Sequence, residues 1–133
     1  MKHLLAFTFL LLLSVSLSAK EQSEQQPSGT MLAAIWLTST EGDKIETYQK
    51  DGKWFGKLVA SNSKDAPLGT TVLRNFVLID GQWRGQVYSI KRDQEADGTI
   101  EPSLDTLVID IPIAFFSITL NWHNEKSQRN KTE

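Results

Sequence analysis

Residues 43–60 read DKIETYQKDGKWFGKLVA, two alternating segments joined by Asp51-Gly52. In the first segment Ile45 and Thr47 alternate with charged or larger polar neighbours, and the second alternates in the same way from Trp54 onward. A type I′ turn needs positive φ at both central positions, which glycine adopts without steric cost and aspartate tolerates. Alternating segments joined by Asp-Gly are therefore typical of a β-hairpin. We predict one over residues 43–60.

The pattern continues on both sides of this hairpin. Asp80-Gly81 predicts a second hairpin, because it joins β-branched residues 70–79 to alternating residues 82–91. A short helix over residues 70–74 is the alternative for the start of that segment. Further strands are predicted over residues 31–39, 104–111 and 113–122.

Three features break these strands or bend them. Pro112 cannot donate to a sheet ladder, so we expect a break there. Residues 92–102 are expected to form an acidic loop around Asp97-Gly98. Gly56 and Gly85 lie in mid-strand, where glycine often marks a bend, and both positions suit the corners of a barrel.

The strand pattern predicts an all-β fold. Seven or eight short strands that follow one another along the chain indicate an antiparallel up-and-down meander, closed as a barrel or folded as a sandwich. We favour the small closed barrel, because no long crossover is evident and closure removes exposed strand edges. The chain has no cysteine, so its core must supply stability without disulfides.

The ends of the 133-residue chain predict its organisation. Residues 1–19 have a positive head, an apolar run and small residues at a cleavage site near Ser18 or Ala19, as in a secretory signal peptide. We expect a disordered linker over 20–30, the barrel over 31–123 and a flexible polar tail over 124–133. An exported chain without cysteine favours a bacterial protein, periplasmic or secreted. We expect no integral membrane segment in the mature chain.

Composition argues against several function classes. A net charge of −2 disfavours nucleic-acid binding, which selects for clustered Lys and Arg. Without cysteine, and with only His3 and His123, thiolate metal sites and Cys–His or Ser–His catalysis are not expected. We predict no catalytic residues, no metal and no cofactor, and we do not expect an enzyme.

Two acidic features have a functional and a structural interpretation. Asp93–Gly98 carries oxygens at the spacing of a calcium loop, but Leu104 stands where a bidentate Glu is needed, which favours a solvated hairpin tip with a turn at Asp97-Gly98. Asp110 lies in an apolar stretch, where it would mark a site or, more simply, be satisfied by backbone N–H groups at a strand end. His123 has no evident metal-ligand partners.

A set of Trp, Gly and strand positions across the chain forms a recognisable order: Trp36, Gly56–Val59, Leu68-Gly69, Leu73–Phe76, Trp83–Tyr88 and Trp122. On these positions the chain resembles the domain-of-unknown-function family 2147, small exported bacterial proteins similar to lipocalin-like (calycin) barrels. The resemblance implies a lipocalin-like barrel over most of the mature chain and transfers no catalytic residue. After Tyr88 this chain departs from the family's Asp-Pro and Gly-Lys-x-Tyr segments.

The aromatic residues give the candidate site. Trp36, Trp54, Trp83 and Trp122 fall one to a strand, and alternate residues of a closed barrel point inward. These rings either fill a core or line a cavity for a small apolar or amphipathic ligand, with polar groups such as Thr47, Arg84 or Ser117. The alternative function is an envelope protein–protein interaction or structural module without an internal ligand. The candidate ligand-binding residues are Trp36, Trp54, Trp83, Arg84, Tyr88 and Phe115.

Overall fold

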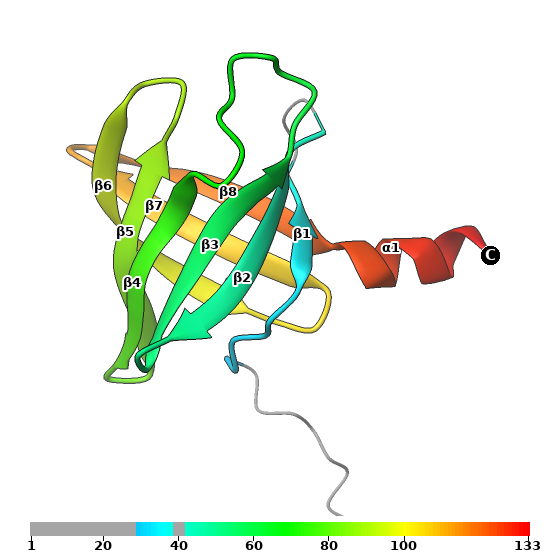
Figure 1. Ribbon diagram of the computed structural model, residues 1–133. Helices are drawn as coiled ribbons and strands as arrows, with labels where there is room; N and C mark the ends of the chain where they lie inside the picture. The colour runs from blue at the N-terminus through cyan, green and yellow to red at the C-terminus, as the bar shows by residue number, and fades with distance from the viewer. Residues whose placement is uncertain (1–28, 39–41) are drawn as a thin grey trace, which may run out of the picture.

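The computed structural model describes residues 29–38 and 42–133. Eight antiparallel strands form a closed barrel in chain order, which confirms the predicted all-β meander and agrees with a small lipocalin-like barrel. Strands β2–β5 curve across the front, β6 lies beside β5 at the left edge, β7 and β8 cross behind, and helix α1 projects from the side (Figure 1). The elements are β1 (Ile35–Leu37), β2 (Lys44–Lys50), β3 (Lys53–Ala60), β4 (Thr71–Ile79), β5 (Gln82–Ser89), β6 (Gln94–Pro102), β7 (Thr106–Ile113), β8 (Phe116–Asn124) and α1 (Glu125–Thr132).

Both Asp-Gly hairpins are confirmed. Lys50 pairs with Lys53 across the first turn and Ile79 with Gln82 across the second. Asp51 and Gly52 have φ values of 53° and 74°, and the second turn repeats this with 50° and 77°. The left-handed backbone that a type I′ turn requires is therefore present at both central positions of each turn.

The prediction of an acidic loop over residues 92–102 was wrong, because residues 94–102 form strand β6. Asp97 pairs with Gln86 and Gly98 pairs with Gly85 on β5. A Cβ atom at Gly98 would lie 2.8 Å from a methyl group of Val87, so this glycine makes room for a core side chain and is not a turn residue. The predicted turn at Asp97-Gly98 is therefore absent, and the β5–β6 connection lies at residues 90–93.

Three further boundaries differ from the sequence prediction. Pro112 does not end β7, which continues to Ile113 and pairs there with Phe116 across the turn at Ala114-Phe115. Residues 71–74 are strand, so the alternative of a short helix there was wrong. The expected flexible tail contains α1, because Asn124 caps its N-terminus by accepting a 3.0 Å hydrogen bond from the Lys126 N–H.

The inward faces of the strands form one apolar core. Trp36, Leu73, Phe76, Leu107 and Ile109 are completely buried. Trp54 and Trp83 are partly buried and pack against the same cluster, and Trp122 belongs to it. The buried rings leave little room at the middle of β5, where a Cβ atom on Gly85 would lie 2.7 Å from the ring of Phe76 and 2.6 Å from the Arg74 carbonyl oxygen.

A segment before β1, the N-terminal strap (residues 29–34), lies against the core near Trp83. Met31 is only 4% exposed, and the Trp83 indole N–H donates a 2.5 Å hydrogen bond to the Gly29 carbonyl. The buried Thr47 hydroxyl donates to the Leu32 carbonyl (2.6 Å) and accepts from the Trp36 indole N–H (2.9 Å). It also accepts from the Ala34 N–H at 3.2 Å, so one hydroxyl joins the strap, β1 and β2.

Candidate functional site

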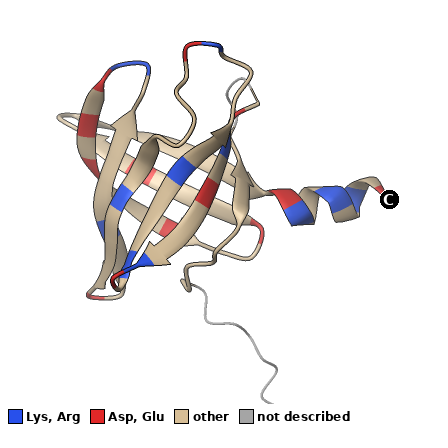
Figure 2. Ribbon diagram, in the orientation of Figure 1, with Lys and Arg blue, Asp and Glu red and all other residues tan. Residues whose placement is uncertain are grey.

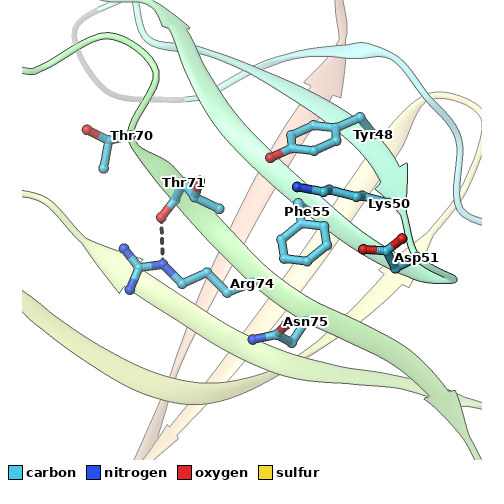
Figure 3. A pocket seen from close by; sticks show the side chains of 8 residues that line it. All are labelled: Tyr48, Lys50, Asp51, Phe55, Thr70, Thr71, Arg74 and Asn75. Atoms are coloured by element: carbon cyan, nitrogen blue, oxygen red, sulfur yellow. Dashed lines mark hydrogen bonds between the residues drawn. The ribbon is translucent and has the colours of Figure 1, made fainter.

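The candidate site is a groove on the outer surface of the barrel, across β2, β3 and β4. Its volume is about 650 Å³, within the range of small-molecule sites. Its side chains come from β2, β3 and β4 and from the β2–β3 and β3–β4 connections (Figure 3). The lining residues are Tyr48, Lys50, Asp51, Phe55, Thr70, Thr71, Arg74 and Asn75.

Two stacked rings form one wall of the groove. Tyr48 on β2 and Phe55 on β3 are paired across the sheet, and their ring centroids lie 5.7 Å apart at an interplanar angle of 21°. Both alternate with inward residues, Thr47 and Gly56, so their rings face outward. The Lys57 ammonium lies 5.3 Å from the Tyr48 ring centroid, a cation–π geometry. The wall is therefore an apolar surface next to a positive charge.

A β-bulge in β4 forms the opposite wall. The pairing register of β4 shifts against β3 on one side and against β5, between Arg74 and Val77, on the other. Asn75 lies at both shifts with a φ of 58°, a left-handed conformation that asparagine tolerates better than most residues. The extra residue lets Leu73 and Phe76 point into the core while Arg74 and Asn75 both border the groove.

Arg74 is held in place by three neighbours. Its Nε donates to the Thr71 carbonyl at 2.8 Å, and its guanidinium donates to the Glu95 carboxylate at 2.8 Å. The guanidinium carbon lies 4.4 Å from the Tyr88 ring centroid. Because Glu95 offsets its charge, Arg74 provides shape and hydrogen-bond donors more than net charge. Among the described residues Lys50 and Lys57 have no carboxylate partner within ion-pair distance.

The Tyr88 ring, which lies against the Arg74 guanidinium, has a phenol with a raised pKa. Tyr88 donates a 2.6 Å hydrogen bond to the Asp93 carboxylate, and this bond raises the pKa of the Tyr88 phenol, with smaller contributions from desolvation and from the charge of Asp93. The Arg74 charge lowers the pKa of Tyr88 and opposes this shift in part. A raised pKa means that folding favours the protonated phenol, so this contribution to stability is complete below pH ~10 and is lost as the pH rises through the pKa of the folded state.

Replacing Asp93 by Asn should lower the pKa of Tyr88, because the carboxylate that holds the phenolic proton is removed while the Arg74 charge remains. We expect the natural chain to have a higher free energy of unfolding than D93N, and we expect this difference to decrease as the pH rises above about 10. NMR titration of the phenol carbon in a Tyr48→Phe background, where Tyr88 is the only tyrosine, measures the pKa directly. An unchanged or higher pKa in D93N would contradict the role given to Asp93.

The structure does not gather the six residues predicted from the sequence into one site. Trp36 is fully buried, and Trp54 and Trp83 pack against the core. Arg84 is exposed on the outer face of β5, and Phe115 is fully exposed (103%) at the tip of the β7–β8 hairpin. Tyr88 lies on the outer face of β5 beside Arg74.

None of the residues that line the groove was among the predicted site residues, for two reasons. Tyr48 and Phe55 occupy the outward positions of the first predicted hairpin, so the alternation alone could have placed both rings on one outer face. The bulge at Asn75 has no comparable sequence signal, because Asn within a β-branched segment does not show where an extra residue enters the ladder. The sequence analysis gave weight to tryptophan and to inward positions, which here form the core.

The other polar candidates have simpler surroundings. Asp110 accepts a 2.6 Å hydrogen bond from the Thr119 hydroxyl on the paired strand, so its partner is a cross-strand side chain and not a strand-end backbone group. Ser117 and His123 are exposed on β8. In residues 29–38 and 42–133, no cluster of three or more His, Asp or Glu is placed to hold a metal ion. No helix in that same part of the chain has the length and apolar character to cross a membrane.

The chain matches no protein-family model, no curated protein and no solved structure.

Proposed function

We propose that this protein is an exported binding barrel whose ligand is a small organic anion with a flat apolar face, held in the outer groove over β2–β4. The stacked rings of Tyr48 and Phe55, next to the ammonium groups of Lys50 and Lys57, carry this proposal. Offset stacking suits a flat apolar ligand face, and two ammonium groups without a carboxylate partner among the described residues favour an anionic substituent. Export rests on the signal-peptide pattern of residues 1–19, which lie outside the described residues.

The outer groove is a better candidate than the interior because the inward aromatic rings have packing partners of their own. The Trp36 indole N–H is used by Thr47, and the Trp83 indole N–H by Gly29. By contrast, Lys50 is exposed at the groove and has no ion pair among the described residues. Basic residues lie on β3 and β4, whereas acidic residues lie along β6 (Figure 2).

Binding can be tested with a matched pair of naphthalene probes. We expect 2-naphthoate to shift the backbone amide NMR signals of Lys50, Phe55 and Asn75 in a saturable way, and 2-naphthylmethylammonium to bind more weakly. Lys50→Glu should weaken naphthoate binding by about fivefold or more, because an attractive charge becomes a repulsive one. Lys53→Glu is the matched control, since Lys53 pairs with Lys50 in the hairpin but does not line the groove.

Three outcomes would overturn this assignment. Equal binding of the two probes would remove the role of charge. An equal loss in Lys53→Glu would show a general field effect in place of a contact in the groove. Shifts confined to the indole N–H signals of Trp36 and Trp83 would move the site to the interior.

A further inference from the structure

The Arg74 side chain begins in the outer groove and ends outside it. Arg74 borders the groove, yet its guanidinium points away from the stacked rings of Tyr48 and Phe55 (Figure 3). The guanidinium lies against the Tyr88 ring on β5 and donates a 2.8 Å hydrogen bond to the Glu95 carboxylate on β6. Glu95 itself does not line the groove. A positive charge at the groove wall is therefore held by a carboxylate from outside the groove.

The Arg74 guanidinium has hydrogen-bond donors that its neighbours do not use. Of its five N–H groups, the one on Nε donates to the Thr71 carbonyl at 2.8 Å and one on Nη1 donates to Glu95. Within residues 29–38 and 42–133, Nη2 has no hydrogen-bond partner. Guanidinium groups bind carboxylate and phosphate oxygens through such N–H groups. Arg74 can therefore bind an anionic group of a ligand.

The ion pair between Arg74 and Glu95 is open to competition. The two side chains are 33% and 45% exposed, so water reaches both charges. Exposed ion pairs contribute little to stability, because solvent screens the attraction and two long side chains lose conformational freedom. The other contacts of Arg74, with the Thr71 carbonyl and the Tyr88 ring, do not depend on Glu95. A ligand anion can thus replace the Glu95 carboxylate while these two contacts stay.

The groove offers two cationic positions that are set apart from each other. The Lys50 ammonium lies beside the rings of Tyr48 and Phe55, whereas the Arg74 guanidinium lies on the Thr71 side, directed away from the rings (Figure 3). A ligand that stacks on the rings and places one anionic group at Lys50 leaves Arg74 paired with Glu95. A second anionic group is needed to engage Arg74.

We propose that the ligand is a flat organic dianion, whose second carboxylate or phosphate group displaces Glu95 from Arg74. This inference rests on the proposed function, because the first anionic group occupies the Lys50 side of the same groove. Since the rings and Lys50 already hold the ligand, its second anionic group competes with Glu95 at a high effective concentration. Glu95 is then a specificity-determining residue: it keeps Arg74 paired against a ligand with one anionic group and releases it to a ligand with two.

A matched pair of probes tests this exchange. 6-(Carboxymethoxy)-2-naphthoate carries a second carboxylate on a flexible arm, and 6-(2-hydroxyethoxy)-2-naphthoate carries a neutral hydroxyl in its place. By isothermal titration calorimetry we expect the natural chain to bind the dicarboxylate about fivefold more tightly than the hydroxyl probe. Arg74→Gln should remove this preference. Glu95→Gln should raise the affinity for the dicarboxylate by a further factor of about three and leave the affinity for the hydroxyl probe unchanged.

Asp97→Asn is the matched control for Glu95→Gln. Asp97 is exposed on the same outer face of β6, so D97N removes an equal charge from the same strand. Among the described residues, Asp97 has no ion pair with Arg74. We expect D97N to leave the preference for the dicarboxylate unchanged. Urea unfolding shows whether each variant is folded.

Several results would overturn the inference and leave the proposed function standing, because the hydroxyl probe would still bind beside Lys50. Equal binding of the two probes by the natural chain would remove the second anionic group. A dicarboxylate affinity that is unchanged or lower in E95Q would show that Glu95 does not compete. A preference that persists in R74Q, or that D97N raises as much as E95Q does, would show a general field effect. Failure of both probes to bind would overturn the proposed function, and this inference with it.

Discussion

Replacing Gly85 by Ala is expected to lower the free energy of unfolding by about 3 kcal/mol. The new Cβ atom would lie 2.6 Å from the Arg74 carbonyl oxygen and 2.7 Å from the Phe76 ring. Neither neighbour can easily move, because the carbonyl belongs to the bulged strand and the ring is completely buried. The ~0.4–1 kcal/mol that alanine gains by restricting the unfolded chain does not offset this overlap. Urea unfolding followed by tryptophan fluorescence measures the change.

Gly56→Ala is the matched control for Gly85. It places Cβ 3.0 Å from methyl groups of Ile45 and Leu73, which are ends of side chains and can shift by a few tenths of an ångström. We expect a loss of about 1 kcal/mol, at the small end of overpacking effects. Adding Phe76→Leu to Gly85→Ala should recover part of the larger loss, because it removes one of the two overlaps. Equal losses in the two alanine variants would contradict the steric explanation.

Thr47→Val should cost about 2–4 kcal/mol, although valine has nearly the same shape as threonine. The buried hydroxyl satisfies the Trp36 indole N–H, the Ala34 N–H and the Leu32 carbonyl, and valine can satisfy none of them. A buried donor without a partner costs about 1–3 kcal/mol, and Trp36 is completely buried. Because the strap depends on this residue, hydrogen exchange at Ala34 should accelerate as well.

Thr47→Ser separates the hydroxyl from the methyl group. Serine keeps the hydrogen bonds and loses one buried methyl, so we expect a loss of only about 1 kcal/mol. The two variants are compared by urea unfolding. A valine variant as stable as the natural chain, or a serine variant less stable than the valine variant, would show that packing and not hydrogen bonding holds the strap.

Local patterns in the sequence predicted most of the barrel. The turns at Asp51-Gly52 and Asp80-Gly81 were found because their backbone conformation depends on two adjacent residues. Strand β6 was missed because the reason for Gly98 lies in the facing residues Gly85 and Val87, which are distant in sequence. Helix α1 was missed because none of its residues is buried, so it has no apolar periodicity to detect.

The outer groove was less predictable than the fold. From the sequence alone, an inward-facing tryptophan and an outward-facing tyrosine are equally plausible ligand-binding residues. They are distinguished only once it is known which face of each strand points into the barrel. The register shift at Asn75 brings Arg74 toward Tyr88 and Glu95, contacts that span 14 and 21 residues of sequence. Such contacts depend on the relative register of strands β4, β5 and β6, which cannot be predicted from a local sequence pattern.

The pairing of β1 with β8 has a consequence for how the protein acquires its fold. Trp36 and Asn124 lie opposite each other although 88 positions separate them. While the nascent chain is still leaving the ribosome, the strand that completes the cylinder has not been synthesised, and the partner of β1 is missing. Closure of so long a loop is entropically unfavourable until the intervening strands are aligned. Pairing of β1 with β8 is therefore the last step of folding, and the barrel stays unclosed until β8 has left the ribosome and the strands between the two are aligned.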